Sequence, residues 1–135
     1  MQVIQYKTLI PSLSIIQTAT VMTTHHTTML KQELLKALAS IEGLTAEPST
    51  VSGGIALFFR GCEFAHFHND NELDLRLTKK VIQAQGIAHP TDSTHHPDRS
   101  PSSPWIEVRF TKESEVERTA ELIKLAIAQL MMATK

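Results

Sequence analysis

The first regular pattern along the chain is a set of apolar residues spaced three and four positions apart over residues 29–42. This spacing gives a helix one continuous apolar face. Gly43 follows the pattern, at the position where a residue in the left-handed conformation commonly ends a helix. We therefore predict an amphipathic helix over 29–42. Its apolar face consists of Leu30, Leu34, Ala37, Leu38 and Ile41.

The segments on either side of this helix lack a regular pattern. Residues 23–28 are polar and β-branched, and we interpret them as a linker in which Thr27 or Thr28 caps the helix. Residues 45–52 contain Pro48 and several small polar residues, so we expect a loop. Residues 1–28 as a whole are expected to form an N-terminal arm. It is either poorly ordered, an upstream extension of the reading frame, or a segment added at a sheet edge.

Three short segments next show the composition and alternation of β-strands. Residues 55–60 and 62–68 are rich in apolar and aromatic side chains, and Gly61 between them predicts a tight hairpin. Residues 69–71 are Asn, Asp and Asn, which favour a turn. Residues 73–77 alternate strictly between leucine and charged residues. Together they predict an antiparallel meander.

A short helix and a long loop follow the meander. Thr78 is positioned to cap the helix, and Gly86 is positioned to end it. Residues 88–104 contain four prolines and three histidines and show no periodic pattern. A loop of this length in a compact domain is typically either functional or disordered.

The C-terminal part of the chain predicts one more strand and one more helix. Residues 105–110 alternate, and residues 113–132 carry apolar residues at helical spacing. Ser114 and Glu117 have the spacing of a capping box. The predicted order is α-β-β-β-α-β-α. It indicates an α+β fold with a four-stranded antiparallel sheet and helices on one face, forming a single domain over residues 29–135.

Composition narrows the range of functions. A chain of 135 residues suits one domain, and 13 basic against 14 acidic residues leave no net positive charge for nucleic acid. No apolar run reaches the roughly 20 residues of a membrane helix. The single cysteine, Cys62, excludes an internal disulfide and favours a cytoplasmic location. We expect Cys62 to be a buried, inert thiol, although a nucleophile beside His66 or His68 is the alternative.

The alternation of side chains predicts which residues share the face of the sheet away from the helices. Phe64, His66 and His68 fall on that face, with Ala65 and Phe67 on the other. Such a face is commonly solvated, with ion pairs between strands, but a tryptophan on it also suits a binding surface. The predicted face carries His66, His68, Asp74, Arg76, Trp105, Glu107 and Arg109.

The His66-Phe67-His68 sequence places two imidazoles on one side of a strand, about 7 Å apart. A zinc or iron ion held by His66 and His68 needs at least one further ligand. Glu63 lies on the opposite side of the strand unless a bulge intervenes. Histidines that bond to the backbone or simply face solvent are the alternative. The candidates for a third ligand are Glu63, Asp74, His89, His95 and His96.

Three blocks between Gly54 and Ala128 resemble the small proteins of the luciferase family, or luciferase domain. The blocks are residues 54–68, residues 73–90 and residues 105–118 with the helix that follows. The resemblance implies a shared pattern and no light emission, since nothing here indicates a luciferin or flavin site. The order of elements is also similar to the YjbR-like double-wing fold. The residues that look characteristic of the luciferase family are Glu63, His66, His68, His89 and Trp105.

Two functions remain open at this point. The favoured hypothesis is a non-catalytic module whose helix-free face contacts a protein partner, a second copy of the chain or a small ligand. The alternative is a small metal-dependent or histidine-based enzyme, with a divalent metal as its cofactor and a site at Glu63, His66, His68 and His89. The position of loop 88–104 distinguishes them, because a loop that covers the histidines creates a site. The expected binding surface consists of Glu63, His66, His68, Asp74, Arg76, His89, Trp105 and Arg109.

Overall fold

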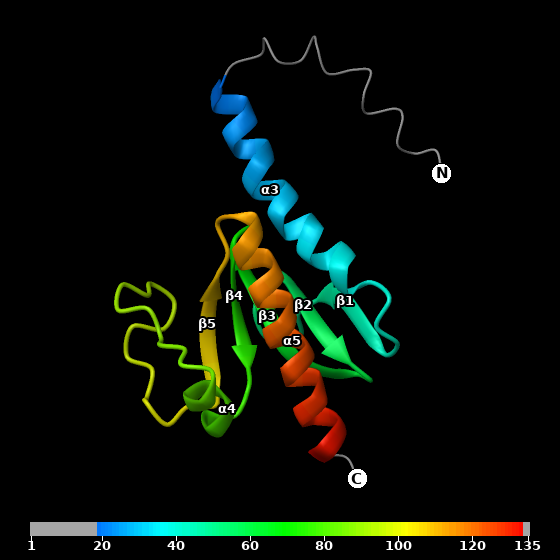
Figure 1. The fold of residues 1–135 in the computed structure, drawn as a ribbon, viewed down its shortest axis with the longest axis vertical. Coiled ribbons are helices and arrows are strands. Elements are labelled where there is room, and N and C mark those ends of the chain that lie inside the picture. Colours follow the sequence, from blue (N-terminus) through cyan, green and yellow to red (C-terminus); the bar gives the residue numbers. More distant parts are fainter. Residues whose placement is uncertain (1–18, 134–135) are drawn as a thin grey trace.

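The computed structural model describes residues 19–133, and the side chains of 29–133 (Figure 1). Five antiparallel strands form one sheet in the order β1-β2-β3-β4-β5. The predictions for the N-terminal arm fall largely on residues 1–18, which lie outside the described residues. The elements are α3 (Ala19–Leu38), β1 (Leu44–Pro48), β2 (Ile55–Phe59), β3 (Cys62–Asn69), β4 (Glu72–Arg76), α4 (Lys79–Ala84), β5 (Trp105–Arg109) and α5 (Glu113–Ala133).

The predicted α+β class and antiparallel meander are confirmed, but the sheet has a fifth strand. Residues 44–48 form β1, which pairs with β2 from Leu44 opposite Phe59 to Pro48 opposite Ile55. The prediction of a loop over 45–52 is therefore wrong for its first half. β1 is an edge strand with four of its five residues exposed, so it has no buried face to impose alternation. Pro48 stands at its end, where an edge strand tolerates proline.

The first helix begins earlier and ends earlier than predicted. Residues 23–28, interpreted as a linker, belong to α3, which starts at Ala19 and ends at Leu38. Neither glycine nor proline interrupts residues 19–28, so nothing in the backbone prevents the helix from extending through these polar residues. Turns connect Leu38 to Gly43, which has the expected left-handed conformation with φ of 90°.

The helices pack against one face of the sheet and enclose the core between the two layers. α5 lies across the sheet, contacts β4 and β5, and packs beside α3 (Figure 1). Leu30, Leu34 and Leu38 of α3 are buried, as their spacing predicts, whereas Ala37 is exposed. No helix within residues 19–133 is long and apolar enough to cross a membrane. The sheet contributes Leu57, Phe59, Ala65, Phe67, Leu73, Leu75, Ile106 and Val108 to this core.

The predicted hairpin turn at Gly61 and the predicted cap of α4 are confirmed. Arg60 and Gly61 both have positive φ, at 52° and 84°, which is the backbone of a two-residue hairpin turn. The Thr78 hydroxyl accepts a hydrogen bond from the Val81 N–H and caps α4. The capping box at Ser114 is wrong, because the glutamate that reaches back is Glu115. Its carboxylate accepts hydrogen bonds from the N–H and hydroxyl of Thr111.

Candidate functional site

Two irregularities in β3 set the positions of its polar side chains. Pairing with β2 shifts between Leu57 and Phe58, so that Phe58 lies opposite Glu63 and Ala56 opposite His66. The extra residue is Phe64, which is fully buried in the core and not on the outer face as predicted. The bulge breaks the alternation and brings Glu63 to the same side as His66. Glu63 therefore lies beside His66, as the sequence allowed only if a bulge intervened.

A second irregularity lies at the end of β3. Pairing with β4 shifts between Phe67 and Asn69, which leaves His68 as the extra residue. The Nδ1–H of His68 donates a hydrogen bond of 2.8 Å to Glu72. Because a carboxylate only accepts, this bond leaves the other ring nitrogen of a neutral His68, Nε2, with its lone pair.

Loop 88–104 folds back over this face of the sheet. Arg99 donates two hydrogen bonds to Asp74, one to each carboxylate oxygen, across 25 positions of sequence. Ser93 donates a 2.7 Å hydrogen bond to Glu107 of β5, and its oxygen accepts one from the N–H of His96. Since Asp74 and Glu107 are each only 2% exposed, the loop buries two acidic residues that alternation predicted on an open face.

The loop also brings further imidazoles to the cluster. His95 stacks on His68 with ring centroids 4.1 Å apart, and His96 lies 5.3 Å from the same ring. The Nε2–H of His89 donates to the backbone carbonyl of His96 at 2.8 Å. His89 thus holds the backbone that carries His96. Its own ring is not among the side chains whose spacing suits a metal ion.

Two imidazole nitrogens approach Asp74 without forming hydrogen bonds to it. Nε2 of His66 and Nε2 of His96 lie 3.8 Å and 3.5 Å from Oδ2 of Asp74. Nδ1 of His66 lies 3.6 Å from Glu63. Nδ1 of His66 and Nε2 of His96 are both buried without a hydrogen-bond partner. Buried polar atoms normally have partners, so these two nitrogens are exceptions; that of His96 faces Asp74, whereas that of His66 faces Glu63.

Burial and local charges set the protonation of the cluster. Burial lowers the pKa of His66, although the negative charge of Asp74 partly opposes this effect. Burial likewise lowers the pKa of His96 against the charge of Asp74. For Glu63, burial raises the pKa, but hydrogen bonds from Ser49 and Thr50 outweigh it and leave the pKa lower than usual. These directions favour neutral rings at His66 and His96 and an ionised carboxylate at Glu63 near pH 7.

Two groups of side chains in the described residues have the composition and spacing of a metal site. His66, His68, Asp74 and His96 each offer one ligand atom, and these atoms lie within 4.8 Å of one another. His68 also forms a second group with Glu72 and His95. The predicted pair His66 and His68 is thus joined by Asp74 and His96, two of the five candidates for a third ligand.

Several predicted residues have other positions. Trp105 lies against His66, with ring centroids 5.6 Å apart, and Arg109 bonds Asp92 and Glu107 at the edge of the cluster. Cys62 is exposed beside the hairpin turn, and not buried as expected. Sequence reasoning missed Arg99. The signal for it was the length of the loop, because the sequence holds no local pattern that pairs position 99 with position 74.

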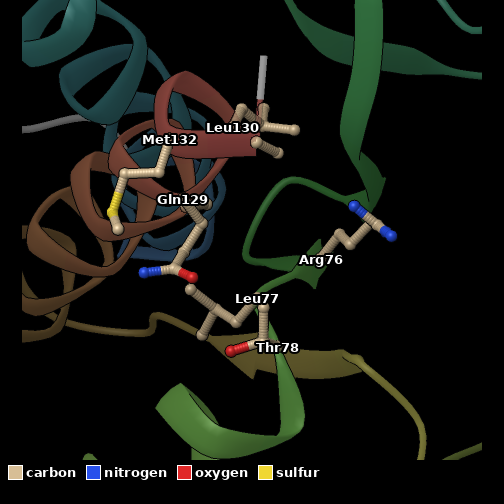
Figure 2. Close-up of a pocket in the computed structure, with 8 residues that line it drawn as sticks. Arg76, Leu77, Thr78, Gln129, Leu130 and Met132 are labelled. Atoms are coloured by element: carbon tan, nitrogen blue, oxygen red, sulfur yellow. The ribbon is translucent and has the colours of Figure 1, made fainter. Parts of the chain in front are cut away.

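Arg76, which was predicted on the binding face, is exposed and lines a separate cavity of about 360 Å³. Figure 2 shows Leu77, in the segment after β4, lying opposite Gln129 of α5 across this cavity. None of the residues in the two groups of possible metal ligands lines this cavity. Its walls are Arg76, Leu77, Thr78, Ala126, Gln129, Leu130, Met132 and Ala133.

Comparison with known proteins supports the resemblance noted in the sequence. Residues 61–126 match the family model described as Luciferase domain, which confirms the predicted family resemblance. The matched segment runs from the β2–β3 turn into α5. It includes every residue of the two groups of possible metal ligands. No curated protein and no solved structure matched the chain.

Proposed function

We propose that this luciferase-family domain binds one divalent transition-metal ion between His66, His68, Asp74 and His96. The observation that carries the proposal is the convergence of four ligand atoms, one from each residue, within 4.8 Å. Imidazole nitrogen with a carboxylate is a typical ligand set for zinc and related ions. Ca²⁺ and Mg²⁺ are disfavoured, because they prefer oxygen ligands.

The distances in the cluster suit such an ion after a small contraction. With bonds near 2 Å, ligand atoms in a tetrahedral zinc site lie about 3.3 Å apart. The distances from Oδ2 of Asp74 to Nε2 of His66 and Nε2 of His96 are 3.8 Å and 3.5 Å. Movements of a few tenths of an ångström would bring each of the two nitrogens to this distance from Oδ2 of Asp74. They would also give the unpartnered nitrogen of His96 a partner.

The charge around the cluster also favours a divalent cation. Four buried or half-buried carboxylates lie on this face and meet two guanidinium groups, those of Arg99 and Arg109. Among these carboxylates and guanidinium groups two negative charges are in excess, and a divalent ion neutralises them. The carboxylates belong to Glu63, Glu72, Asp74 and Glu107.

Carboxylates behind the imidazoles give further support. A histidine that binds a metal usually donates its other ring N–H to a carboxylate or carbonyl, which fixes the ring. Glu72 accepts from Nδ1 of His68 at 2.8 Å, and Glu63 lies 3.6 Å from Nδ1 of His66. In both rings, Nε2 is left for the ion.

The interaction module that the sequence favoured is less well supported. It requires an open sheet face around His66, His68 and Trp105, whereas the loop residues Ser93 and Arg99 bond directly to side chains on that face. A protein partner or second copy stays a prediction. A metal-dependent enzyme is compatible with the same centre and adds the requirement for an open coordination position.

Elemental analysis of protein purified without a His tag, followed by zinc titration, tests the proposal. We expect one equivalent of zinc in the unaltered protein, and an affinity at least about a hundredfold lower in His66→Ala and His96→Ala variants. Asp98→Asn and Glu121→Gln are the controls, since neither residue belongs to the two groups of ligand residues. The proposal fails if the unaltered protein takes up no zinc at saturation, or if the cluster variants bind as tightly as the controls.

A further inference from the structure

Asp74 is hydrogen-bonded by Arg99 on one side and approached by two imidazoles on another. Arg99 donates from both terminal nitrogens, Nη1 to Oδ1 and Nη2 to Oδ2, the second at 2.8 Å. The imidazoles of His66 and His96 approach the same carboxylate from elsewhere, and both are nearest to Oδ2. Asp74 and Arg99 are both largely buried, with 2% and 10% of their side-chain surfaces exposed. The carboxylate therefore has one orientation fixed by the loop.

This two-pronged contact limits what Asp74 can offer a metal. A guanidinium that bonds both oxygens occupies the lone pairs on the side of the carboxylate that faces it. Chelation of one ion by both oxygens needs the same lone pairs. With Arg99 in place, each oxygen of Asp74 keeps one outward lone pair, and Oδ2 is the oxygen nearest to His66 and His96.

We propose that Arg99 is a positioning residue that holds Asp74 as a one-oxygen ligand and thereby makes the centre four-coordinate and selective for zinc over manganese. The inference rests on the metal site proposed above. Three imidazoles and one carboxylate oxygen give the coordination number that zinc prefers in proteins. A carboxylate free to chelate would raise the coordination number, which suits ions that prefer more oxygen ligands.

The choice of arginine fits this role. Its planar fork matches the two oxygens of a carboxylate, whereas a lysine ammonium is a point charge that fixes orientation less well. Arg109 provides the natural comparison on the same face. Its ion-pair partners among the described residues are Glu107, Glu72 and Asp92, and Asp74 is not one of them. Removing Arg109 takes away the same charge near the cluster while leaving the carboxylate of Asp74 held.

Cobalt(II) in place of zinc reports the coordination number, because four-coordinate cobalt absorbs visible light far more strongly than five- or six-coordinate cobalt. The experiment compares the unaltered protein with Arg99→Gln, Arg99→Lys and the control Arg109→Gln. The readouts are the cobalt spectrum and the ratio of zinc to manganese dissociation constants. For Arg99→Gln we expect weaker absorption and a preference for zinc reduced about tenfold or more. Arg99→Lys should lie between it and the unaltered protein, and Arg109→Gln should match the unaltered protein.

The outcomes separate this inference from the proposed metal site. If the unaltered protein binds no zinc, the proposed function fails and the inference fails with it. If zinc binds but Arg99→Gln keeps the cobalt spectrum and the zinc preference, only the inference is overturned. Equal changes in Arg99→Gln and Arg109→Gln would also overturn it, because they would show a general effect of charge. If Arg99→Gln does not fold, Arg99→Lys decides. An unchanged cobalt spectrum in Arg99→Lys would overturn the inference, because it would show that the two hydrogen bonds of the guanidinium are not needed.

Discussion

Arg99 and Asp74 are joined by two hydrogen bonds that connect the middle of loop 88–104 to the centre of β4. This contact converts a face that alternation predicts to be open into a covered one. It also explains why His96, which lies three residues before Arg99, reaches the two histidines of β3. This ion pair, together with the hydrogen bonds of His89 and Ser93 to the backbone of His96, thus brings His96 to the candidate metal site.

The first prediction concerns protection of the loop by metal. Arg99 is the only lysine or arginine in residues 88–104, so trypsin cleavage within the loop can occur only after it. If cleavage requires the loop to lift away and release the ion, zinc at 100 times its dissociation constant should slow cleavage about a hundredfold. The measurement is the rate at which fragments 1–99 and 100–135 appear, with and without a chelator.

Cleavage after Lys79 or Lys80, at the exposed start of α4, serves as the internal control for this experiment. Zinc should leave that rate unchanged. An identical rate at Arg99 with and without zinc would show that the loop is not held by a metal.

The second prediction concerns the hydrogen bond between Ser93 and Glu107. Ser93→Ala removes the donor to a carboxylate that is 2% exposed and also the acceptor for the N–H of His96. A buried polar group left without its partner destabilises a protein by about 1–3 kcal/mol. Ser93→Ala should lower the free energy of unfolding by that amount in urea denaturation. Ser100→Ala removes only exposed hydrogen bonds, those of its hydroxyl with the hydroxyl and the N–H of Ser102, and should have little effect. Equal losses in both variants would argue against a buried anchor at Ser93.

The third prediction concerns the bulge in β3. Because Phe64 is fully buried and Phe58 is half-buried, Phe64→Ala should reduce the free energy of unfolding by about 3–5 kcal/mol, and Phe58→Ala by clearly less. Strict alternation makes the opposite prediction, since it places Phe64 on the outer face. Chemical denaturation of the two variants distinguishes the registers, and a larger loss for Phe58→Ala would contradict the observed bulge.

Local patterns in the sequence account for most of the fold. The leucines of β4 and α3 are buried as their spacing predicts, and Gly61 and Thr78 have the expected turn and cap positions. Local patterns fail where a strand has no buried face, as in β1. They also fail at Phe64, because a bulge adds one residue without a distinctive side chain to mark it.

The candidate site was only partly predictable for a different reason. His66 and His68 are neighbours on one strand, so their spacing indicated a shared face. Arg99 and Ser93 reach the site through contacts between distant positions, which no periodic pattern records. The loop is nevertheless rich in prolines, and these reduce the conformational freedom that it loses when it docks on the sheet.

The last prediction concerns the N-terminus of α5 and its dependence on pH. The carboxylate of Glu115 accepts a 2.7 Å hydrogen bond from the N–H of Thr111 and a 3.0 Å bond from its hydroxyl. The backbone hydrogen bond from Thr111 is the main cause of a pKa below the ordinary value of 4.5, and partial burial opposes it. Glu115→Ala should therefore reduce the free energy of unfolding at pH 7 by about 1 kcal/mol.

The sign of the pH effect follows from the lowered pKa of Glu115. A carboxyl whose pKa is lower in the folded state stabilises the fold fully above its unfolded value of about 4.5, and this contribution disappears as pH falls through the folded value. The difference between the unaltered protein and Glu115→Ala should thus shrink below pH 4.5 in parallel denaturation curves. Glu113→Ala is the matched control, because Glu113 is an exposed glutamate in the same helical turn. A difference that persists unchanged at pH 3 would assign the role of Glu115 to packing of its side chain and not to its charge.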